Sequence, residues 1–173
     1  AARDAGAQVT LIAGPTALPT PRGVRRVDVT TAHEMMGAVM DQLPTDVFIS
    51  VAAVADWHVS NQSASKIKKG ASATPPALQF APNPDILATV AALPSAPYCV
   101  GFAAESDDVI ANARRKLAGK KVPLMVANRA QDVFGVDSSE LSLIDADGVT
   151  PLPTADKVAQ ARRLIAEIAS RLR

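Results

Sequence analysis

Apolar residues occur in short runs, and helix-like segments separate the runs. Val9–Ala13 is a β-rich run that follows Gly6, a residue typical of a helix end. Val27–Val29 predicts a second short strand. Val47–Ala52 is apolar without alternation, which is typical of a strand buried on both faces of a sheet.

The segment between the second and third strands predicts a helix. Thr31 and Glu34 have the spacing of a capping box, with Thr31 as the N-cap. The apolar face of this helix carries Met35, Val39 and Leu43, and the helix is expected to end before Pro44.

The regular pattern stops after Asp56 and resumes at about Leu78, which predicts a long loop. Loops of this length in compact domains are usually lids, binding loops or disordered links. Beyond the loop, Asn83 suits an N-cap, Pro84 the first helical position and Asp85 the first turn.

The second half continues the alternation and predicts an α/β fold. Strands are expected at Tyr98–Ala103, Leu124–Ala127 and Leu141–Asp145, with a helix over about 107–118 and a turn at Asp147–Gly148. Thr154 is expected to cap a last helix whose inner stripe is Val158, Ala161, Ile165, Ile168 and Leu172. Strands spaced by helices imply right-handed crossovers, so we expect a Rossmann-like three-layer fold with a mainly parallel sheet, in one domain over residues 1–173.

The first residues read as the end of a helix. Ala1–Ala5 would complete a βαβ unit only if a strand preceded them, and we expect that upstream segment to be missing. The alternative is a short natural start. The missing strand would lie between Val9–Ala13 and Val47–Ala52, in a three-two-one-four order. Without it, two apolar edges would remain unpaired, and the 173 residues should fold poorly alone.

Composition narrows the class of protein. Apolar residues make up 48% of the chain, which excludes disorder, and the formal charge of +1 makes nucleic acid an unexpected partner. No apolar run is long enough to span a membrane, and no signal peptide opens the chain. The single cysteine, Cys99, lies in an apolar run and cannot form an internal disulfide. We therefore expect a cytoplasmic protein without a membrane partner.

Several candidate sites follow the predicted strands, where doubly wound sheets bind ligands. Gly14-Pro15-Thr16 lacks the further glycines of the dinucleotide fingerprint and could be a plain turn. Asp56 follows four small or apolar residues and could accept from a ribose or base, help to hold Mg²⁺, or be a surface acid.

The positively charged candidates are lysines. Lys66 opens Lys-Ile-Lys-Lys-Gly inside the long loop, which suits a flap closing on phosphates, although a solvated charge run is equally compatible with it. Lys116 and Lys120 share one helix face, where they could bind phosphates or interact with the helix dipole. Phe102, at the end of a strand, could stack on a base or lie in the core. His33 and His58 lack metal-site spacing, so the metal ligands stay unknown.

Taken in order, these motifs resemble one enzyme family. Ala-Ala-Val-Ala-Asp, Lys-Ile-Lys-Lys, Asn-Pro-Asp-Ile, Gly-Phe-Ala-Ala-Glu and Lys-x-x-x-Lys are similar to bacterial CTP-dependent phosphopantothenoylcysteine synthetases, from about Ala7 to the last helix. The resemblance implies CTP and Mg²⁺, which activate the carboxylate of 4′-phosphopantothenate as an acyl-cytidylate. L-cysteine then forms the amide. Base preference cannot be fixed from these residues, because eukaryotic relatives use ATP.

The resemblance also implies roles for individual residues. Nucleotide-binding residues would be Ser50, Val51, Ala52, Asp56, Lys66, Pro84, Asp85, Ile86, Leu87, Phe102, Lys116 and Lys120, with Lys66 also catalytic. The family is a homodimer whose flap can contact the partner's site. It is usually fused behind a flavin-dependent decarboxylase, and it has an upstream asparagine segment with no counterpart here. A Rossmann-like NAD(P)-dependent oxidoreductase or a noncatalytic nucleotide-binding module is the alternative.

Overall fold

The computed structural model describes residues 1–63, 65–66, 75, 77–129, 131 and 137–172. The described elements are β1 (Thr10–Ala13), β2 (Arg25–Asp28), α1 (Ala32–Met40), β3 (Val47–Ser50), β4 (Trp57–Val59), β5 (Phe80–Pro82), α2 (Ile86–Ala91), β6 (Tyr98–Glu105), α3 (Val109–Lys120), β7 (Leu124–Arg129), β8 (Ser138–Ile144), β9 (Val149–Asp156) and α4 (Lys157–Arg171). This order confirms the predicted α/β fold.

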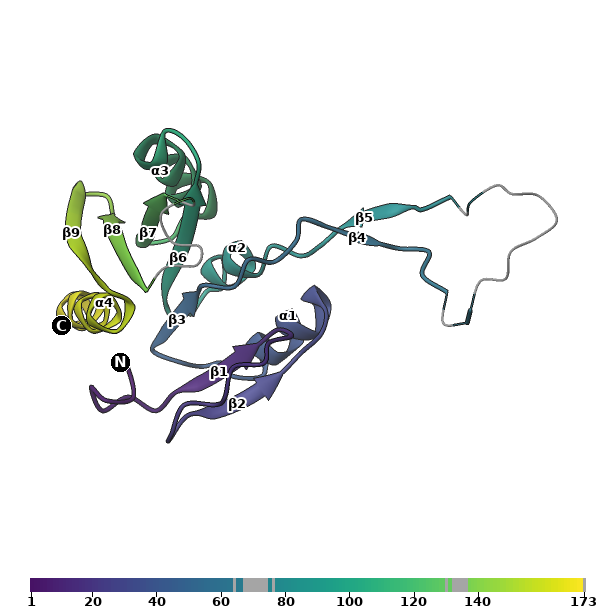
Figure 1. Ribbon diagram of the computed structural model, residues 1–173, viewed down its shortest axis with the longest axis horizontal. Coiled ribbons are helices and arrows are strands. Elements are labelled where there is room, and N and C mark those ends of the chain that lie inside the picture. The colour runs from purple at the N-terminus through teal and green to yellow at the C-terminus, as the bar shows by residue number, and fades with distance from the viewer. Residues whose placement is uncertain (64, 67–74, 76, 130, 132–136, 173) are drawn as a thin grey trace.

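The main sheet is mixed rather than mainly parallel. Its strand order is β3-β6-β7-β8-β9 (Figure 1). β3, β6 and β7 are parallel to one another, β8 is antiparallel to β7, and β9 is antiparallel to β8. The turn that the sequence predicts at Asp147–Gly148 joins β8 directly to β9. Asp145 Oδ1 accepts the backbone N–H groups of Asp147 and Gly148, each at 2.9 Å, and so stabilises this turn.

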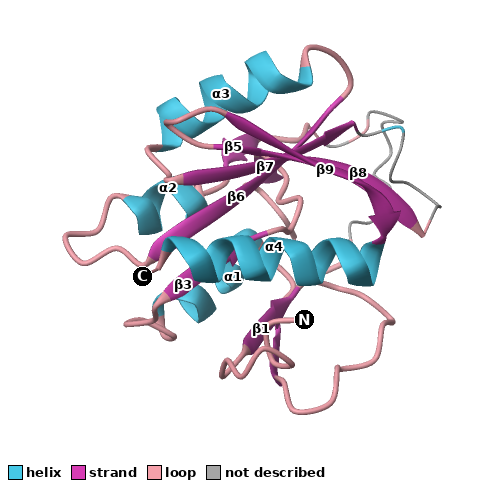
Figure 2. Cartoon of the chain, turned by 90° about the vertical axis from the view of Figure 1, so that its left-hand side faces the viewer, coloured by secondary structure: helices cyan, strands magenta, loops and turns pink. Residues whose placement is uncertain are grey.

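Helices cover both faces of the main sheet, which gives the expected three layers (Figure 2). On one face, side chains of α2 and α3 pack with alternate residues of β6 and β7; the buried members include Leu87, Val90, Cys99, Ala113 and Met125. On the other face, Leu164 and Ile168 of α4 pack against the remaining alternate positions. Cys99 is therefore a core residue, and burial raises the pKa of its thiol. No helix in the described ranges is both long and apolar enough to span a membrane.

The first two strands form a sheet of their own. β1 pairs in parallel with β2, and among the described residues neither strand is hydrogen-bonded to β3. Ile12 of β1 and Phe48 of β3 nevertheless pack against the same hydrophobic cluster. β1 and β3 thus belong to separate sheets, and the strand expected between them stays a prediction.

The predicted capping box of α1 is confirmed. The backbone N–H of Glu34 donates to Thr31 Oγ1 at 3.1 Å, and Glu34 Oε2 accepts the backbone N–H of Thr31 at 3.2 Å. Backbone hydrogen bonds from Thr30 and Thr31 lower the pKa of Glu34. The helix ends at Met40, so Leu43 lies beyond it rather than on its apolar face.

The start of the last helix was predicted wrongly. Thr154 lies in β9, and the N-cap of α4 is Asp156, whose Oδ1 accepts the backbone N–H of Ala159 at 2.8 Å. The stripe was right in part, since Ile168 is buried and Ile165 packs against the core. Val158 and Leu172 are instead 58% and 48% exposed, and the buried positions include Gln160 and Leu164. The two prolines of β9 do not favour a strand, so the sequence pattern did not predict this one. β9 is an edge strand, and an edge strand tolerates proline because one side of its backbone needs no hydrogen-bond partner.

The predicted long loop contains two strands, which corrects that prediction. β4 and β5 pair antiparallel, with Val59 opposite Phe80, and form a ribbon that projects from the body (Figure 1). We call residues 57–82 the arm. The side chain of Asn61 extends the pairing past β4, since it donates to Ala77 O at 2.8 Å and accepts the N–H of Gln79 at 2.9 Å.

Candidate functional site

Most of the predicted site residues lie near the carboxyl ends of β3 and β6. Ser50 of β3 pairs with Gly101 of β6, and the chain then leaves the sheet through Val51 and Ala52 toward the arm. Among these, Val51 is exposed and Ala52 lines a cavity described below. These short side chains leave the backbone of the strand end accessible to a ligand.

Asn83 ties the strand end to the start of α2. Its backbone N–H donates to Asp56 O at 2.8 Å, and its Nδ2 donates to Ala55 O at 2.8 Å. Asp56, predicted to recognise the nucleotide, has an exposed side chain beside this junction. The structure therefore brings Asp56 close in space to Pro84, although 27 residues separate them in the sequence.

The helix after Pro84 begins later than the sequence predicts. Asp85, not Asn83, is the N-cap of α2, because its Oδ1 accepts the backbone N–H of Ala88 at 3.1 Å. Ile86 and Leu87 are buried in the core, so a ligand could reach only their backbone. Asn83 and Asp85 are both good N-cap residues, and the sequence pattern could not separate them.

Gly101 allows α2 to lie close to the sheet. A Cβ at this position would come within 2.7 Å of Leu87 Cδ2 and 2.9 Å of Met125 Cε. Any side chain there would push against two core residues, one of them on α2. Glycine in Gly-Phe-Ala-Ala-Glu thus has a packing reason, which helps to fix where α2 begins.

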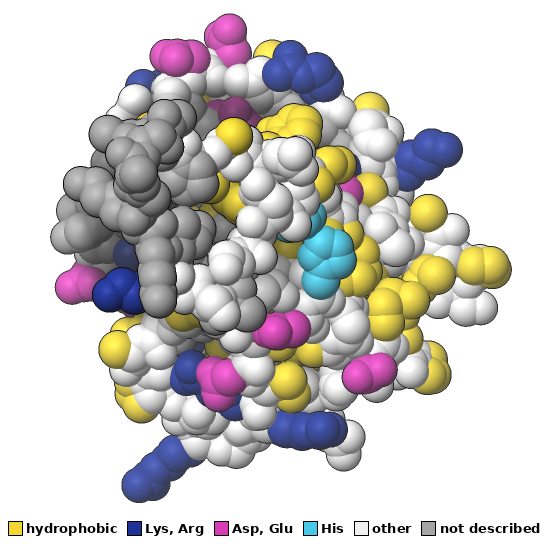
Figure 3. Space-filling model, turned by 90° about the vertical axis from the view of Figure 1, so that its right-hand side faces the viewer, with side chains coloured by type: hydrophobic (Ala, Val, Ile, Leu, Met, Phe, Trp, Pro, Cys, Tyr) yellow, Lys and Arg dark blue, Asp and Glu magenta, His cyan; other side chains and the backbone are white. Residues whose placement is uncertain are grey.

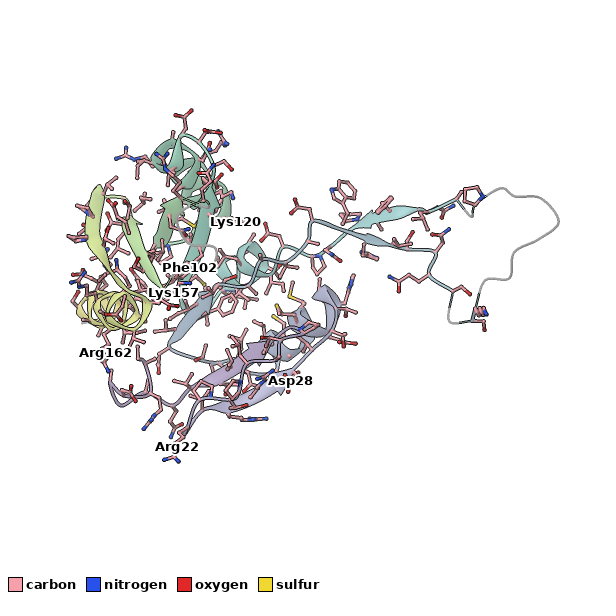
Figure 4. The ribbon with its side chains drawn as sticks, viewed as in Figure 1. Arg22, Asp28, Phe102, Lys120, Lys157 and Arg162 are labelled. Carbon is pink, nitrogen blue, oxygen red and sulfur yellow. The ribbon has the colours of Figure 1, made fainter. Side chains whose placement is uncertain are left out.

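Both predicted phosphate-binding lysines are paired with carboxylates. Lys116 Nζ lies 2.7 Å from Glu105 Oε1, and Lys120 Nζ lies 2.6 Å from Asp85 Oδ2 (Figure 4 labels Lys120). Burial alone would raise the pKa of Asp85, but hydrogen bonds from Lys120 and from the Ala88 N–H outweigh it and lower that pKa. Two positive and two negative charges therefore meet where β6, α2 and α3 adjoin.

Two predicted residues do not join this group. Phe102 is half-buried and packs with the hydrophobic cluster on the α4 face of the sheet, away from the face that α2 and α3 cover. Lys66 is exposed on the arm, beyond the β4–β5 pairing. Lys68, Lys69 and Gly70 of the same motif lie outside the described residues.

A cavity of about 660 Å³ lies beside this group, at the carboxyl ends of β1, β2 and β3. Its lining includes Gly14, Pro15, Thr30, Thr31, His33, Ala52, Ala53, Val54, Ala55, His58, Gln62 and Asn83. Of the predicted site residues, only Ala52 is in this lining. The Gly14-Pro15 turn and Asn83 were singled out as motifs, and the cavity brings them together.

The two histidines meet at the cavity, which the sequence did not predict. The rings of His33 and His58 form an edge-to-face contact with centroids 5.2 Å apart. In Figure 3, viewed from the arm side, histidine in cyan lies at the surface beside hydrophobic side chains in yellow. Within the described ranges, no three His, Cys, Asp or Glu side chains are placed to hold a metal ion. The contact joins α1 to the arm.

Comparison with known proteins gives consistent matches over nearly the whole chain. The family model of the DNA/pantothenate metabolism flavoprotein C-terminal domain matches residues 1–172. The coenzyme A biosynthesis bifunctional protein CoaBC of Vibrio vulnificus (strain YJ016) is 41% identical over 97% of this chain and 43% of that protein. The protein of the same name from Escherichia coli (strain K12) is 42% identical over 99% of this chain and 44% of its own length.

A solved structure agrees with the sequence matches. The crystal structure of the C-terminal domain of a CoaBC protein superposes with a TM-score of 0.81 and is 31% identical, covering 99% of this chain and 78% of that one. The chain spans less than half the length of the curated relatives it matches.

Proposed function

Because this chain belongs to the family of DNA/pantothenate metabolism flavoprotein C-terminal domains, we propose that it is the synthetase part of a bifunctional enzyme of coenzyme A biosynthesis. The reaction is the CTP-dependent ligation of 4′-phosphopantothenate to L-cysteine in the cytoplasm. The relatives are coenzyme A biosynthesis bifunctional proteins, which supports this pathway. The upstream part of such a protein would carry the flavin-dependent decarboxylase.

The observation that carries this proposal is the paired lysines beside the start of α2. Lys116 and Lys120 present two ammonium groups four residues apart on α3, and each is held by a carboxylate. A triphosphate needs several cations near its phosphates as negative charge builds up during transfer. Asp56 and the backbone at Ser50–Ala52 lie at the same edge of the sheet, which suits the nucleoside part of CTP.

The chemistry takes two steps. A carboxylate oxygen of 4′-phosphopantothenate attacks the α-phosphorus of CTP, and the bond from this phosphorus to the β-phosphate oxygen breaks to release pyrophosphate. The neutral amine of L-cysteine then attacks the acyl carbon, CMP leaves with the electron pair, and the amine loses a proton. Lys66 would be brought by the arm to the reacting phosphate in the first step, where a mobile point charge can follow it.

Mg²⁺ is proposed to arrive with the triphosphate. The described residues hold no cluster of three or more metal-binding side chains, so they do not form a protein cage for the ion. Mg²⁺ bound mainly by substrate phosphates and water, with one or two carboxylates, is its usual arrangement in nucleotide sites. We therefore assign no protein ligand set to the metal.

We also propose that the enzyme is a homodimer joined through the arm. Trp57 and Phe80 are 60% and 63% exposed, and a two-stranded ribbon is marginally stable by itself. Exposed aromatic side chains of this kind commonly anchor interfaces. Light scattering of the Trp57→Ser, Phe80→Ser double variant should then give a smaller mass than the unmodified protein. An unchanged mass would contradict the role of the arm.

The function is tested with a full-length protein that carries this chain. Pyrophosphate release should require both CTP and 4′-phosphopantothenate, and addition of L-cysteine should convert the activated acid to 4′-phosphopantothenoylcysteine. Thermal stabilisation by CTP, compared with ATP and NADPH, separates a CTP ligase from a reductase. Stabilisation by NADPH without pyrophosphate release would overturn the proposal.

A further inference from the structure

Glu105 ends β6 with a carboxylate that is largely covered by protein. Its side chain is 16% exposed, whereas that of its partner Lys116 is 43% exposed. Glu105 Oε2 lies 3.5 Å from Asn112 Nδ2, and Oε1 lies 2.7 Å from the ammonium nitrogen of Lys116. The less exposed member of this ion pair is the carboxylate of Glu105, and the more exposed member is the ammonium of Lys116.

We propose that Glu105 is a positioning residue that holds Lys116 in place for the phosphates of the nucleotide. The inference rests on the proposed function, because it takes Lys116 as a phosphate-binding residue. An ammonium group has three N–H donors, so Lys116 can keep its contact with Glu105 and still donate to a phosphate from its exposed side. A lysine on a four-carbon chain otherwise has many rotamers to lose when a phosphate binds.

A lysine paired with a glutamate beside nucleotide phosphates also occurs in another nucleotide-binding fold. In protein kinases, a lysine that contacts ATP phosphates must be paired with a glutamate to be active. Here Glu105 is the last residue of β6 and lies opposite Arg129 in the parallel pairing with β7, which holds its backbone on one side; the pairing with β3 ends at Gly101. Asn112 is held in turn, since its Nδ2 donates to Asp107 O at 2.8 Å. The acid is therefore fixed before any ligand arrives.

Asp85 cannot be tested as cleanly as Glu105. It pairs with Lys120, but it is also the N-cap of α2 and is 52% exposed. A substitution there would remove a helix cap as well as an ion pair, and the two effects would be mixed. Glu105 caps no helix, so its substitution leaves the helix starts intact and affects the ion pair with Lys116 and the longer contact with Asn112.

A double-mutant cycle in a full-length protein that carries this chain tests the inference. Glu105→Gln and Lys116→Gln should each lower kcat/KM for CTP about tenfold, and the double variant should be no worse than Lys116→Gln alone. Glu105→Asp should recover part of the loss, because it keeps the charge. Glu167→Gln is the matched control: this acid pairs with Arg171 on α4, and its substitution should leave kcat/KM unchanged.

Each outcome decides the matter. Multiplying losses in the double variant, with equal falls in melting temperature for both Glu105 variants, would make Glu105 a structural acid and overturn the inference. A parallel calorimetric titration with CTP keeps the two proposals apart. If the unmodified protein binds CTP but releases no pyrophosphate, the proposed function fails, while non-additive CTP affinities in the cycle would still support the pairing.

Discussion

The two lysine-bearing regions of the molecule are held in very different ways. On α3, Lys116 and Lys120 sit above a packed core, in which Ala113 is fully buried, and both are paired with carboxylates. On the arm, Lys66 is exposed, and the neighbouring strands expose Trp57 and Phe80. Packing within the chain therefore orders the lysines on α3, while the order of the arm depends on its contacts with a ligand or a partner subunit.

This difference separates two tasks. Charges that stabilise a ligand act best when they are fixed beforehand and need no reorganisation. A charge that must reach a reacting group after the substrate has bound needs a segment with few buried contacts. The core-backed lysines suit the first task, and the arm suits the second.

The largest expected effect concerns stability. Leu87→Ala should lower the free energy of unfolding by about 2–5 kcal/mol, because it empties a buried site between α2 and the sheet. Phe80→Ala on the arm should change it by less than about 0.5 kcal/mol in the monomer, since that ring is 63% exposed. Urea unfolding of both variants measures the contrast, at a protein concentration at which light scattering gives the mass of a monomer. Equal losses would remove the distinction between the regions.

The next effect concerns activity without stability. Lys66→Gln should remove a charge-assisted contact worth about 1.5–3 kcal/mol and slow acyl-cytidylate formation by roughly 10–100-fold. The melting temperature should stay unchanged, because Lys66 is exposed. Pyrophosphate release at the unmodified rate would show that the arm lysine is a solvated charge only.

Asp56 lies where the two regions meet, and its effect should be smaller. Asp56→Asn should weaken CTP binding by about 1 kcal/mol, or roughly fivefold, through one lost hydrogen bond. Its backbone carbonyl would still accept the N–H of Asn83, so the junction should persist. Calorimetry decides this, and an unchanged CTP affinity would make Asp56 a surface acid.

The smallest expected effect is the loss, at acidic pH, of the stabilisation that Asp145 gives to the main sheet. The hydrogen bond from Arg171 is the main cause that lowers the pKa of Asp145, and it prevails over burial. The folded pKa is below the unfolded value of about 3.9, so Asp145 stabilises the fold above that pH and ceases to do so as pH falls through the folded pKa. The gap in melting temperature between the unmodified protein and Asp145→Asn should therefore close below about pH 4. A gap that stays constant would contradict the pairing.

Much of the body could be predicted because its signals are local. Thr31 and Glu34 specify their capping box within one turn, and the apolar runs of β3, β6 and β7 need no partner to be recognised. The order of motifs also located Lys116 and Lys120, since their spacing on one helix follows from the helical repeat.

What could not be predicted depends on distant contacts. Each strand of the arm has three residues, and only the pairing of Val59 with Phe80 across the arm makes them strands. The acids that pair with the lysines, Glu105 and Asp85, lie on other elements, so spacing gives no sign of them. The face of the sheet on which Phe102 lies is set by the register of β6 with its neighbours, which the motif does not reveal, and its place in the base site stays a prediction.

The position of the arm also bears on how the chain folds. β3 pairs with β6, so forming the first pair of the main sheet must close the whole stretch 51–97, arm included. The entropy of closing a loop grows only with the logarithm of its length, and doubling that length costs about 0.6 kcal/mol. Lengthening or trimming the arm therefore changes the folding equilibrium very little. The stability of the fold therefore places little constraint on the length of the arm, which can instead match the distance from the body to the group that the arm contacts.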